Sequence, residues 1–249
     1  MRWLLVLCIA CSFTVMAKTQ LTILVGLDKP PYIDLNDSSG YEMDLLREVA
    51  TQMGFDAVFI HVPNARIKDM LLQGNADVAT LQKPDAEQVS LFYSKPYIRY
   101  QNVAASLSVK HLQLTQLDQL KPYTVVAFHN ARLLLGKNYQ GLSKEIALYQ
   151  EVANQSQQLQ MLLLQRCDVV IMDRNIFFYY ARQAGHSMQP FELAELFPAS
   201  LYSAAFRNAA LQRKFDKALA ELQQEPIFTQ LQLKYFSEVN QLLQEPQLQ

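Results

Sequence analysis

The chain has 249 residues, 50% of them hydrophobic, with 22 basic and 23 acidic residues and a formal net charge of −1. This near-neutral balance argues against a nucleic-acid partner, and the length is enough for one large domain or two small lobes. With 3 cysteines, two of them close to the start of the chain, no disulfide framework is available, so stability must come from a hydrophobic core.

Residues 1–17 have the pattern of a secretory signal peptide. Arg2 precedes an apolar core, and Val15-Met16-Ala17 supplies a small-residue cleavage site. The sequence therefore predicts a mature protein that begins at Lys18 and works in the periplasm. Cleavage before Cys11, with lipid anchoring, is the less favoured alternative. No later stretch approaches the roughly 20 apolar residues of a membrane helix.

The next part of the chain alternates strands and helices. The predicted strands are 21–26, 55–62 and 76–81, and the predicted helices are 43–53 and 64–73, each closed by a glycine. This order is typical of a parallel sheet covered by helices. An extended linking segment follows over 95–106.

A second block repeats this alternation after a start at Thr115 that resembles a capping box. The predicted strands are 124–128, 146–149, 169–172 and 202–206. The predicted helices are 131–139, 156–164, 175–184, 211–222 and 226–236. We expect the glutamine-rich tail from Glu238 to be frayed.

The two blocks share a short echo. Met70 and Asp77 stand seven residues apart, as do Met161 and Asp168, and in both places an apolar helical stretch breaks before an aspartate opens an apolar strand. We expect both aspartates to accept hydrogen bonds from turn amides. Asp173, which ends the apolar strand of the second block, has no acidic counterpart in the first.

Seven stretches, in order along the chain, resemble the family 3 extracellular solute-binding proteins that serve ABC importers: "LTILVGLDKPPYIDLND", "GYEMDLLREVATQMGF", "LLQGNADVAT", "YSKPYIRYQNVAAS", "QLDQLKPYTVVAF", "LLLQRCDVVIMD" and "LQRKFDKALAEL". The resemblance implies an α/β fold of the type II periplasmic binding protein kind. Two lobes, each a mostly parallel sheet flanked by helices, are joined by two crossover strands and trap a ligand by hinge closure. Lobe 1 would comprise residues 18–103 and 203–249, and lobe 2 residues 104–202.

The resemblance also nominates two ligand-facing residues. Tyr32 follows Pro31 at the place of the family aromatic whose ring faces the ligand, a place that suits a rigid ring with a hydroxyl. Asp173 matches the acid of lobe 2 that often pairs with a ligand ammonium, and α/β sheets bind ligands at the carboxyl ends of their strands. The alternatives are a tyrosine packed in a loop and a solvated strand end.

The usual clamp for a ligand carboxylate is not visible. Amino-acid binders of the family carry an arginine seven residues before the serine of S-x-P-Y, and counting back from Ser94 gives Glu87. We expect Glu87 to be a solvated helix residue; in the cleft, it would favour a cationic ligand. Arg66 and Arg99 are the candidate replacement cations, and their alternatives are a solvated helix face and the surface of the hinge.

The lobe 2 turn that offers amides to the same carboxylate in the family is here Phe128-His129-Asn130-Ala131. His129 and Asn130 are candidate ligand contacts, with a helix-capping turn as the alternative. The four histidines lack metal-ligand spacing and no common catalytic signature occurs, so we expect neither a metal nor another cofactor.

The resemblance thus implies a monomeric, non-catalytic binding protein. Its partners would be a small polar, amino-acid-like solute and the membrane permease of an ABC importer. The first alternative is an enzyme, because cyclohexadienyl dehydratases resemble the same fold and place an acid in the cleft; such a reaction needs a general acid near a bound carboxylate. The second alternative is a sensory or orphan receptor.

Overall fold

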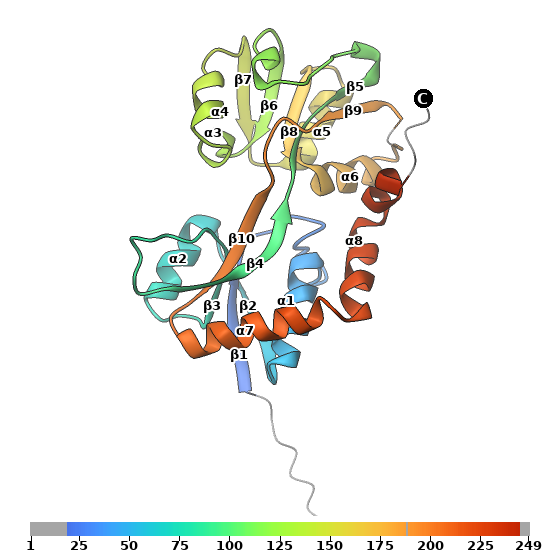
Figure 1. Ribbon diagram of the computed structural model, residues 1–249. Helices are drawn as coiled ribbons and strands as arrows, with labels where there is room; N and C mark the ends of the chain where they lie inside the picture. Colours follow the sequence, from blue (N-terminus) through green and yellow to red (C-terminus); the bar gives the residue numbers. More distant parts are fainter. Residues whose placement is uncertain (1–18, 188, 245–249) are drawn as a thin grey trace, which may run out of the picture.

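The computed structural model describes residues 19–187 and 189–244, with the side chains of the last helix described up to Phe236. The predicted signal peptide, Lys18 and Cys11 lie outside these residues. Two five-stranded sheets lie one above the other in Figure 1, each with its own helices. We use lobe 1 and lobe 2 as names for these two sheets with their helices.

The sheet of lobe 1 is mixed. In spatial order it contains β2 (Phe55–His61), β1 (Thr19–Val25), β3 (Val78–Gln82), β10 (Ser200–Phe206) and β4 (Phe92–Tyr100). β1 pairs with β2 and β3 in parallel, whereas β10 pairs with β3 and β4 antiparallel. The expected parallel group is therefore extended by two strands that return from farther along the chain.

The sheet of lobe 2 has the same plan. In spatial order it contains β7 (Leu148–Val152), β6 (Thr124–Phe128), β8 (Val169–Asp173), β5 (Asn102–Leu107) and β9 (Phe191–Ala194). β6 pairs with β7 and β8 in parallel, and β5 pairs with β8 and β9 antiparallel. Both lobes thus combine two parallel with two antiparallel pairings.

Helices cover both faces of each sheet. In lobe 1 they are α1 (Tyr41–Gln52), α2 (Asn64–Leu72), α7 (Ala209–Leu222) and α8 (Pro226–Gln244). In lobe 2 they are α3 (Ala131–Leu134), α4 (Lys137–Leu142), α5 (Gln155–Leu163) and α6 (Arg174–Gln183), with short 3₁₀ turns at Ser108–Lys110 and Leu117–Leu120. Within the described residues, no helix combines the length and apolarity needed to cross a membrane.

The apolar run of β8 shows why its strand is buried on both faces. Val169 and Ile171 pack into one hydrophobic cluster, and Val170 and Met172 into the cluster on the opposite face. A strand with helices on both sides has no solvent face, so its sequence is continuously apolar and does not alternate. β8, the central strand of its sheet, is buried at all of its positions.

The chain passes between the lobes twice. β4 belongs to the first sheet and β5 to the second, with Gln101 alone between them. The return runs from β9 through residues 195–199 into β10, which lies beside β4 in Figure 1. By strand pairing, Asn102 and Val103 belong with lobe 2, and residues 200–202 with lobe 1.

A side contact also joins the lobes. α8 rises from lobe 1 to meet α6 of lobe 2 (Figure 1). Ile176 of α6 lies buried in the core cluster of lobe 1, and Tyr180 packs against the clusters of both lobes. The hydrophobic core of lobe 1 is therefore completed in part by a helix of lobe 2.

Some predicted elements differ from the observed ones. The helix predicted over 131–139 is broken at Gly136, whose positive φ of 93° turns the chain between α3 and α4. The short edge strand β9 was not predicted. The prediction that the tail is frayed from Glu238 is wrong for residues 238–244, because α8 continues past a break at Phe236 to Gln244.

Candidate functional site

Asp173 lies at the point where β8 ends and α6 begins. Its Oδ1 accepts hydrogen bonds from the backbone N–H of Asn175 (2.9 Å) and of Ile176 (3.2 Å). Aspartate is one of the preferred N-cap residues because it satisfies amides that have no partner inside the helix. The carboxylate that ends the apolar strand is therefore the N-cap of the next helix.

The same carboxylate binds groups outside lobe 2. The Tyr32 hydroxyl of lobe 1 donates to Asp173 Oδ1 (3.0 Å), and the backbone N–H of Gln101 in the crossover donates to Oδ2 (2.9 Å). Asn175 Nδ2 donates to the Tyr32 hydroxyl (2.9 Å). Asp173 is only 4% exposed, and burial raises its pKa to about 6, against the opposing effect of these hydrogen bonds.

Tyr32 is held by its own loop and by two aromatic neighbours. It follows the cis peptide bond of Pro30-Pro31 and is completely buried, with its ring centroid 4.3 Å from that of Tyr100 and 5.6 Å from that of Phe236. Gly40, at φ 123°, passes so close that an added Cβ would overlap the Tyr32 carbonyl. The loop conformation therefore aims the hydroxyl at lobe 2.

Lys29 lies beside this junction. Its Nζ stands 4.5 Å from the ring centroid of Tyr100 and 5.9 Å from that of Tyr32. Burial lowers the pKa of Lys29, while the carboxylates of Glu42 and Asp173 act in the opposite direction. The partly buried ammonium group thus lies against two aromatic rings and in the field of two acids.

Glu42 is a completely buried acid on α1. The Tyr97 hydroxyl donates to its Oε1. Its Oε2 and the hydroxyls of Thr80 and Tyr100 are buried without a well-formed hydrogen bond to any described residue. Burial raises the pKa of Glu42, opposed first by Lys29 and then by the neighbouring hydroxyls. Lobe 1 therefore presents a polar cluster with unused donors and acceptors next to the interlobe junction.

The two candidate arginines are not in this cluster. Arg66 is exposed in the first turn of α2, where its guanidinium makes no hydrogen bond or ion pair with a described residue. Arg99 donates to the side chain of Gln101 (3.0 Å), whose amide in turn donates to the carbonyl of Phe197 (2.8 Å). Arg99 thus braces the two crossovers.

The lobe 2 turn has an internal partner. The backbone N–H groups of Asn130 and Arg132 each donate to the carboxylate of Glu151 on β7 (both 2.9 Å), and the Tyr149 hydroxyl donates to it as well (2.9 Å). Asn130 has a left-handed φ of 65° and caps α3, whereas the ring of His129 is exposed and makes no hydrogen bond with a described residue. The amides that the resemblance assigns to a ligand carboxylate bind a carboxylate of the chain itself.

Glu87 is exposed in a turn, and its backbone N–H donates to the Asp85 carboxylate (3.1 Å). It is solvated, as we expected, but the helix expected around it is absent. Asp85 also accepts a hydrogen bond from Lys68 (2.7 Å). The segment is therefore a charged surface turn on lobe 1.

Sequence reasoning missed Lys29, Glu42 and Glu151. A signal existed for Glu42, which precedes Leu45 by three residues and Val49 by seven, so helical spacing places it on the buried face of α1. No comparable signal marked Glu151 or Lys29. Their partners are distant in sequence or are aromatic rings, which leave no spacing pattern.

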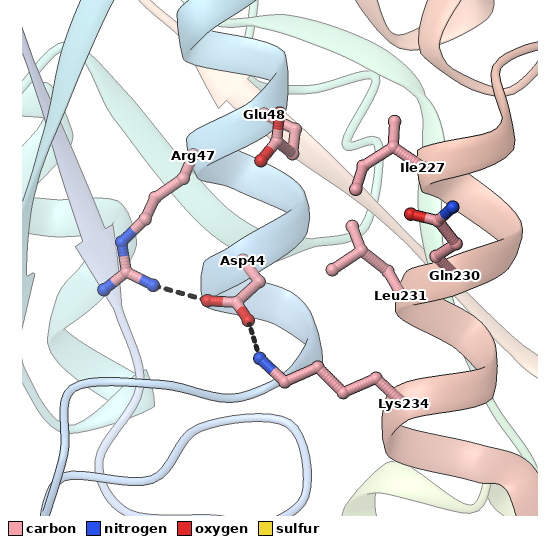
Figure 2. Close-up of a pocket in the computed structure, with 7 residues that line it drawn as sticks. All are labelled: Asp44, Arg47, Glu48, Ile227, Gln230, Leu231 and Lys234. Atoms are coloured by element: carbon pink, nitrogen blue, oxygen red, sulfur yellow. Dashed lines mark hydrogen bonds and ion pairs between the residues drawn. The ribbon is translucent and has the colours of Figure 1, made fainter.

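A separate groove of about 490 Å³ lies on lobe 1 between α1 and α8 (Figure 2). Its lining residues are Asp44, Arg47, Glu48, Ile227, Gln230, Leu231 and Lys234. Asp44 binds Arg47 (2.6 Å) and Lys234 (2.9 Å), so its charge is already compensated. This groove shares no residue with the interlobe junction and helps to attach α8.

Solved structures with the same fold include several binding proteins. An ancestral arginine-binding protein bound to arginine superposes with a TM-score of 0.70 at 21% identity, over 88% of this chain and 99% of that one. A histidine kinase sensor domain with similarity to periplasmic binding proteins gives 0.70 at 19%, over 87% and 96%. An ancestral amino-acid-binding protein that is a precursor of cyclohexadienyl dehydratase gives 0.66 at 19%, over 87% and 95%.

At these identities the structures show the shared two-lobed α/β fold. No curated protein sequence matches the chain. The model of one family, by contrast, matches residues 21–238, which is nearly all of the predicted mature chain. The protein therefore belongs to the bacterial extracellular solute-binding proteins, family 3.

Proposed function

We propose that this family member captures a small polar, amino-acid-like solute between its lobes and delivers it to the membrane permease of an ABC importer. It would act as a monomer in the periplasm, without catalysis, after removal of residues 1–17. The observation that carries the proposal is the junction of Tyr32 and Asp173, which joins the lobes through a buried carboxylate beside the crossover.

Hinge closure is the mechanism that this junction supports. A ligand that makes better contacts when both lobes touch it shifts the population towards the closed arrangement. Gln101 is the single residue between β4 and β5, and its N–H binds Asp173 while its side chain binds the return crossover at Phe197. The site residues and the hinge therefore share hydrogen bonds.

The proposed ligand contacts are of two kinds. Asp173 and Tyr32 are buried, and Asp173 Oδ2 accepts only one hydrogen bond among the described residues, so it retains capacity for a ligand ammonium. The side chains of Arg66 and His129 are exposed and make no hydrogen bond with a described residue, so both are available to a ligand. The backbone N–H of Asn130 is bound to Glu151, so Asn130 would contribute through its exposed side chain. Arg99, which donates to Gln101, would contribute after reorienting its guanidinium.

Calorimetry tests the proposal on the chain expressed without residues 1–17. Amino acids, amines and small peptides are titrated into the wild type, the Asp173→Asn variant and the Asp168→Asn variant. We expect at least one amino acid to bind the wild type, with affinity lost in Asp173→Asn and kept in Asp168→Asn. Folded protein that binds nothing across the panel contradicts a solute-binding role.

A dehydratase-like activity is the second candidate, because Asp173 has a pKa of about 6 in a buried place. A carboxyl of that kind can protonate a departing hydroxyl near neutral pH. Incubation with prephenate or arogenate, followed by detection of an aromatic product, checks this activity. Turnover that disappears in Asp173→Asn would replace the binding proposal.

A sensory receptor is the third candidate, supported by the similar fold of a histidine kinase sensor domain. Import and sensing differ in the membrane partner, so pull-down from membranes with the ligand-saturated chain separates them. Recovery of a permease supports import, and recovery of a kinase supports sensing.

A further inference from the structure

Lys29 is a partly buried cation at the interlobe junction. It follows β1 by a few residues, and its Nζ lies against the rings of Tyr100 and Tyr32 at 4.5 and 5.9 Å. Tyr32 itself donates to Asp173 of the other lobe. The Tyr32 side chain therefore lies between the Lys29 ammonium and Asp173, the residue of lobe 2 to which Tyr32 donates.

The donors of Lys29 are unused. A lysine ammonium has three N–H donors, yet Nζ makes no hydrogen bond or ion pair with any residue of the described part of the chain. Burial lowers its pKa, so leaving the charge there without an acceptor is costly. The carboxylates of Glu42 and Asp173 act in the opposite direction and favour the charged form.

The other cations near the crossovers are committed or exposed. Arg99 donates to Gln101, and the guanidinium of Arg174 pairs with Glu195 at 2.7 Å. Arg66 is exposed on α2. Among the described residues at this junction, Lys29 alone combines a partly buried position with unused donors.

Two amides of the lobe 2 turn already have a partner within the chain. The N–H groups of Asn130 and Arg132 bind the carboxylate of Glu151, which the Tyr149 hydroxyl also holds. The register pairs Ala127 with Ile171, so this turn lies at the same sheet edge as the end of β8. A ligand carboxylate entering the junction meets a lobe 2 turn with two of its amides already bound and an unsatisfied ammonium on lobe 1.

We propose that the Lys29 ammonium binds the carboxylate of an α-amino acid ligand and thereby sets the specificity of the site. The proposal rests on the proposed solute-binding function. The ligand ammonium would face the acids, where Asp173 Oδ2 has an unused lone pair and Glu42 Oε2 makes no well-formed hydrogen bond with a described residue. One cation and two acids give the site a complementary charge pattern for a zwitterion, and the tyrosine rings cover its apolar part.

The test compares each amino acid with the amine that lacks only its carboxylate. The pairs are arginine and agmatine, histidine and histamine, and lysine and cadaverine, titrated by calorimetry into the wild type and Lys29→Met. We expect wild-type protein to bind its amino acid about 10- to 100-fold more tightly than the paired amine, which is the usual worth of a charged hydrogen bond. Lys29→Met should remove that preference and leave the amine affinity within about 3-fold.

Lys83→Met is the matched control, because Lys83 is an exposed lysine whose Nζ lies 5.5 Å from the Tyr202 ring. It should bind like the wild type. Lys29→Arg should restore part of the preference. If Lys29→Met does not fold, the test uses Lys29→Gln together with the preference of the wild type for the amino acid over the paired amine.

The outcomes separate the inference from the function on which it rests. An amino acid that binds equally well with and without its carboxylate, or a Lys29→Met variant that keeps the preference, overturns the role of Lys29 while solute binding stands. An amine that binds Lys29→Met more tightly than wild type overturns it too, because Lys29 then occupies the position of a ligand cation. Absence of any binding by folded wild type overturns both.

Discussion

Asp173 connects three parts of the chain through one carboxylate. It caps α6 through Asn175 and Ile176, it accepts the N–H of Gln101 in the crossover, and it accepts the hydroxyl of Tyr32 from the other lobe. Because burial disfavours the charged form, this arrangement has an energetic cost at neutral pH. The hydrogen bonds to this one buried group offset part of that cost.

The raised pKa of Asp173 makes stability depend on pH. The folded pKa is about 6 and the unfolded value about 3.9, so the stabilising contribution is complete below about pH 4 and is lost as pH rises through about 6. Relative to the wild type, Asp173→Asn should gain about 2 to 3 kcal/mol in free energy of unfolding between about pH 4 and about pH 7. Urea denaturation at both pH values measures the difference.

Asp168 provides the control with the opposite sign. Hydrogen bonds from Thr124 and Lys110 hold its pKa below the usual value, against the effect of burial, so its contribution is lost as pH falls. Between about pH 4 and about pH 7, the free energy of unfolding of Asp168→Asn should therefore rise less, or fall more, than that of the wild type. A pH dependence in Asp173→Asn that equals the wild type would rule out a buried, proton-binding Asp173.

Gly40 gives a second prediction for a single residue. At φ 123° and against the Tyr32 carbonyl, an alanine is both strained and blocked, and strain of this kind costs about 1 to 3 kcal/mol. Gly141 lies in α4, and no neighbouring atom stands within 4 Å of the place that a Cβ would take. It should accept alanine with a gain of about 0.5 to 1 kcal/mol. Thermal melts of Gly40→Ala and Gly141→Ala should shift in opposite directions.

At the scale of elements, the echo between the lobes has a shared geometry. The Asp77 carboxylate accepts the N–H of Thr22 (2.8 Å), and the Asp168 carboxylate accepts the N–H of Thr124 (3.0 Å). In each case the aspartate N–H also donates to the carbonyl of the same threonine. Both acids bind backbone amides, as we expected, but these amides belong to the neighbouring strands β1 and β6 and not to a turn. Each aspartate thus holds the start of a central strand to its neighbour.

This role predicts a modest stability cost. Asp77→Ala should lower the free energy of unfolding by about 0.5 to 1.5 kcal/mol, the net worth of one such hydrogen bond. Asp69→Ala, at an exposed position of α2, should stay within about 0.5 kcal/mol of the wild type. Urea denaturation measures both, and equal effects of the two substitutions would contradict a specific role for Asp77.

The elements that could be predicted from sequence are those with a strong local pattern. β8 has an apolar run from Val169 to Met172, β1 ends in the apolar run Ile23-Leu24-Val25, and α7 carries an apolar stripe from Phe215 to Leu222. β9 was missed because a four-residue edge strand has too little sequence pattern. The end of α8 was missed because its glutamine-rich composition favours the prediction of a frayed tail, although glutamine is a good helix former. For each of these elements, the strength of the local sequence pattern determined whether it could be predicted.

The site was partly predictable for a different reason. Tyr32 and Asp173 follow motifs of the family, and the structure joins them. The contacts of Glu151 with Asn130 and of Lys29 with Tyr100 arise only when distant segments meet at the sheet edges. No spacing rule in a single sequence predicts such pairs.

At the scale of the whole molecule, the lobes are held together at two places. One is the polar junction of Tyr32 with Asp173 and Asn175, and the other is the packing of Ile176 and Tyr180 against the core of lobe 1. The apolar contact depends on buried area, whereas the polar contact depends on two hydrogen bonds made by one hydroxyl. Removing that hydroxyl therefore weakens closure without emptying the core.

Tyr32→Phe should shift the molecule towards an open arrangement. Both lost hydrogen bonds cross between the lobes, and at about 0.5 to 1.5 kcal/mol each they change the ratio of closed to open molecules by roughly tenfold. Small-angle X-ray scattering should show a larger radius of gyration for the unliganded variant, and calorimetry a ligand affinity about tenfold weaker. Tyr149→Phe removes a hydroxyl-to-carboxylate bond within lobe 2 alone, so it should leave both measurements unchanged. Equal scattering curves for wild type and Tyr32→Phe, together with equal affinities, would show that the apolar contact of α6 is what holds the lobes.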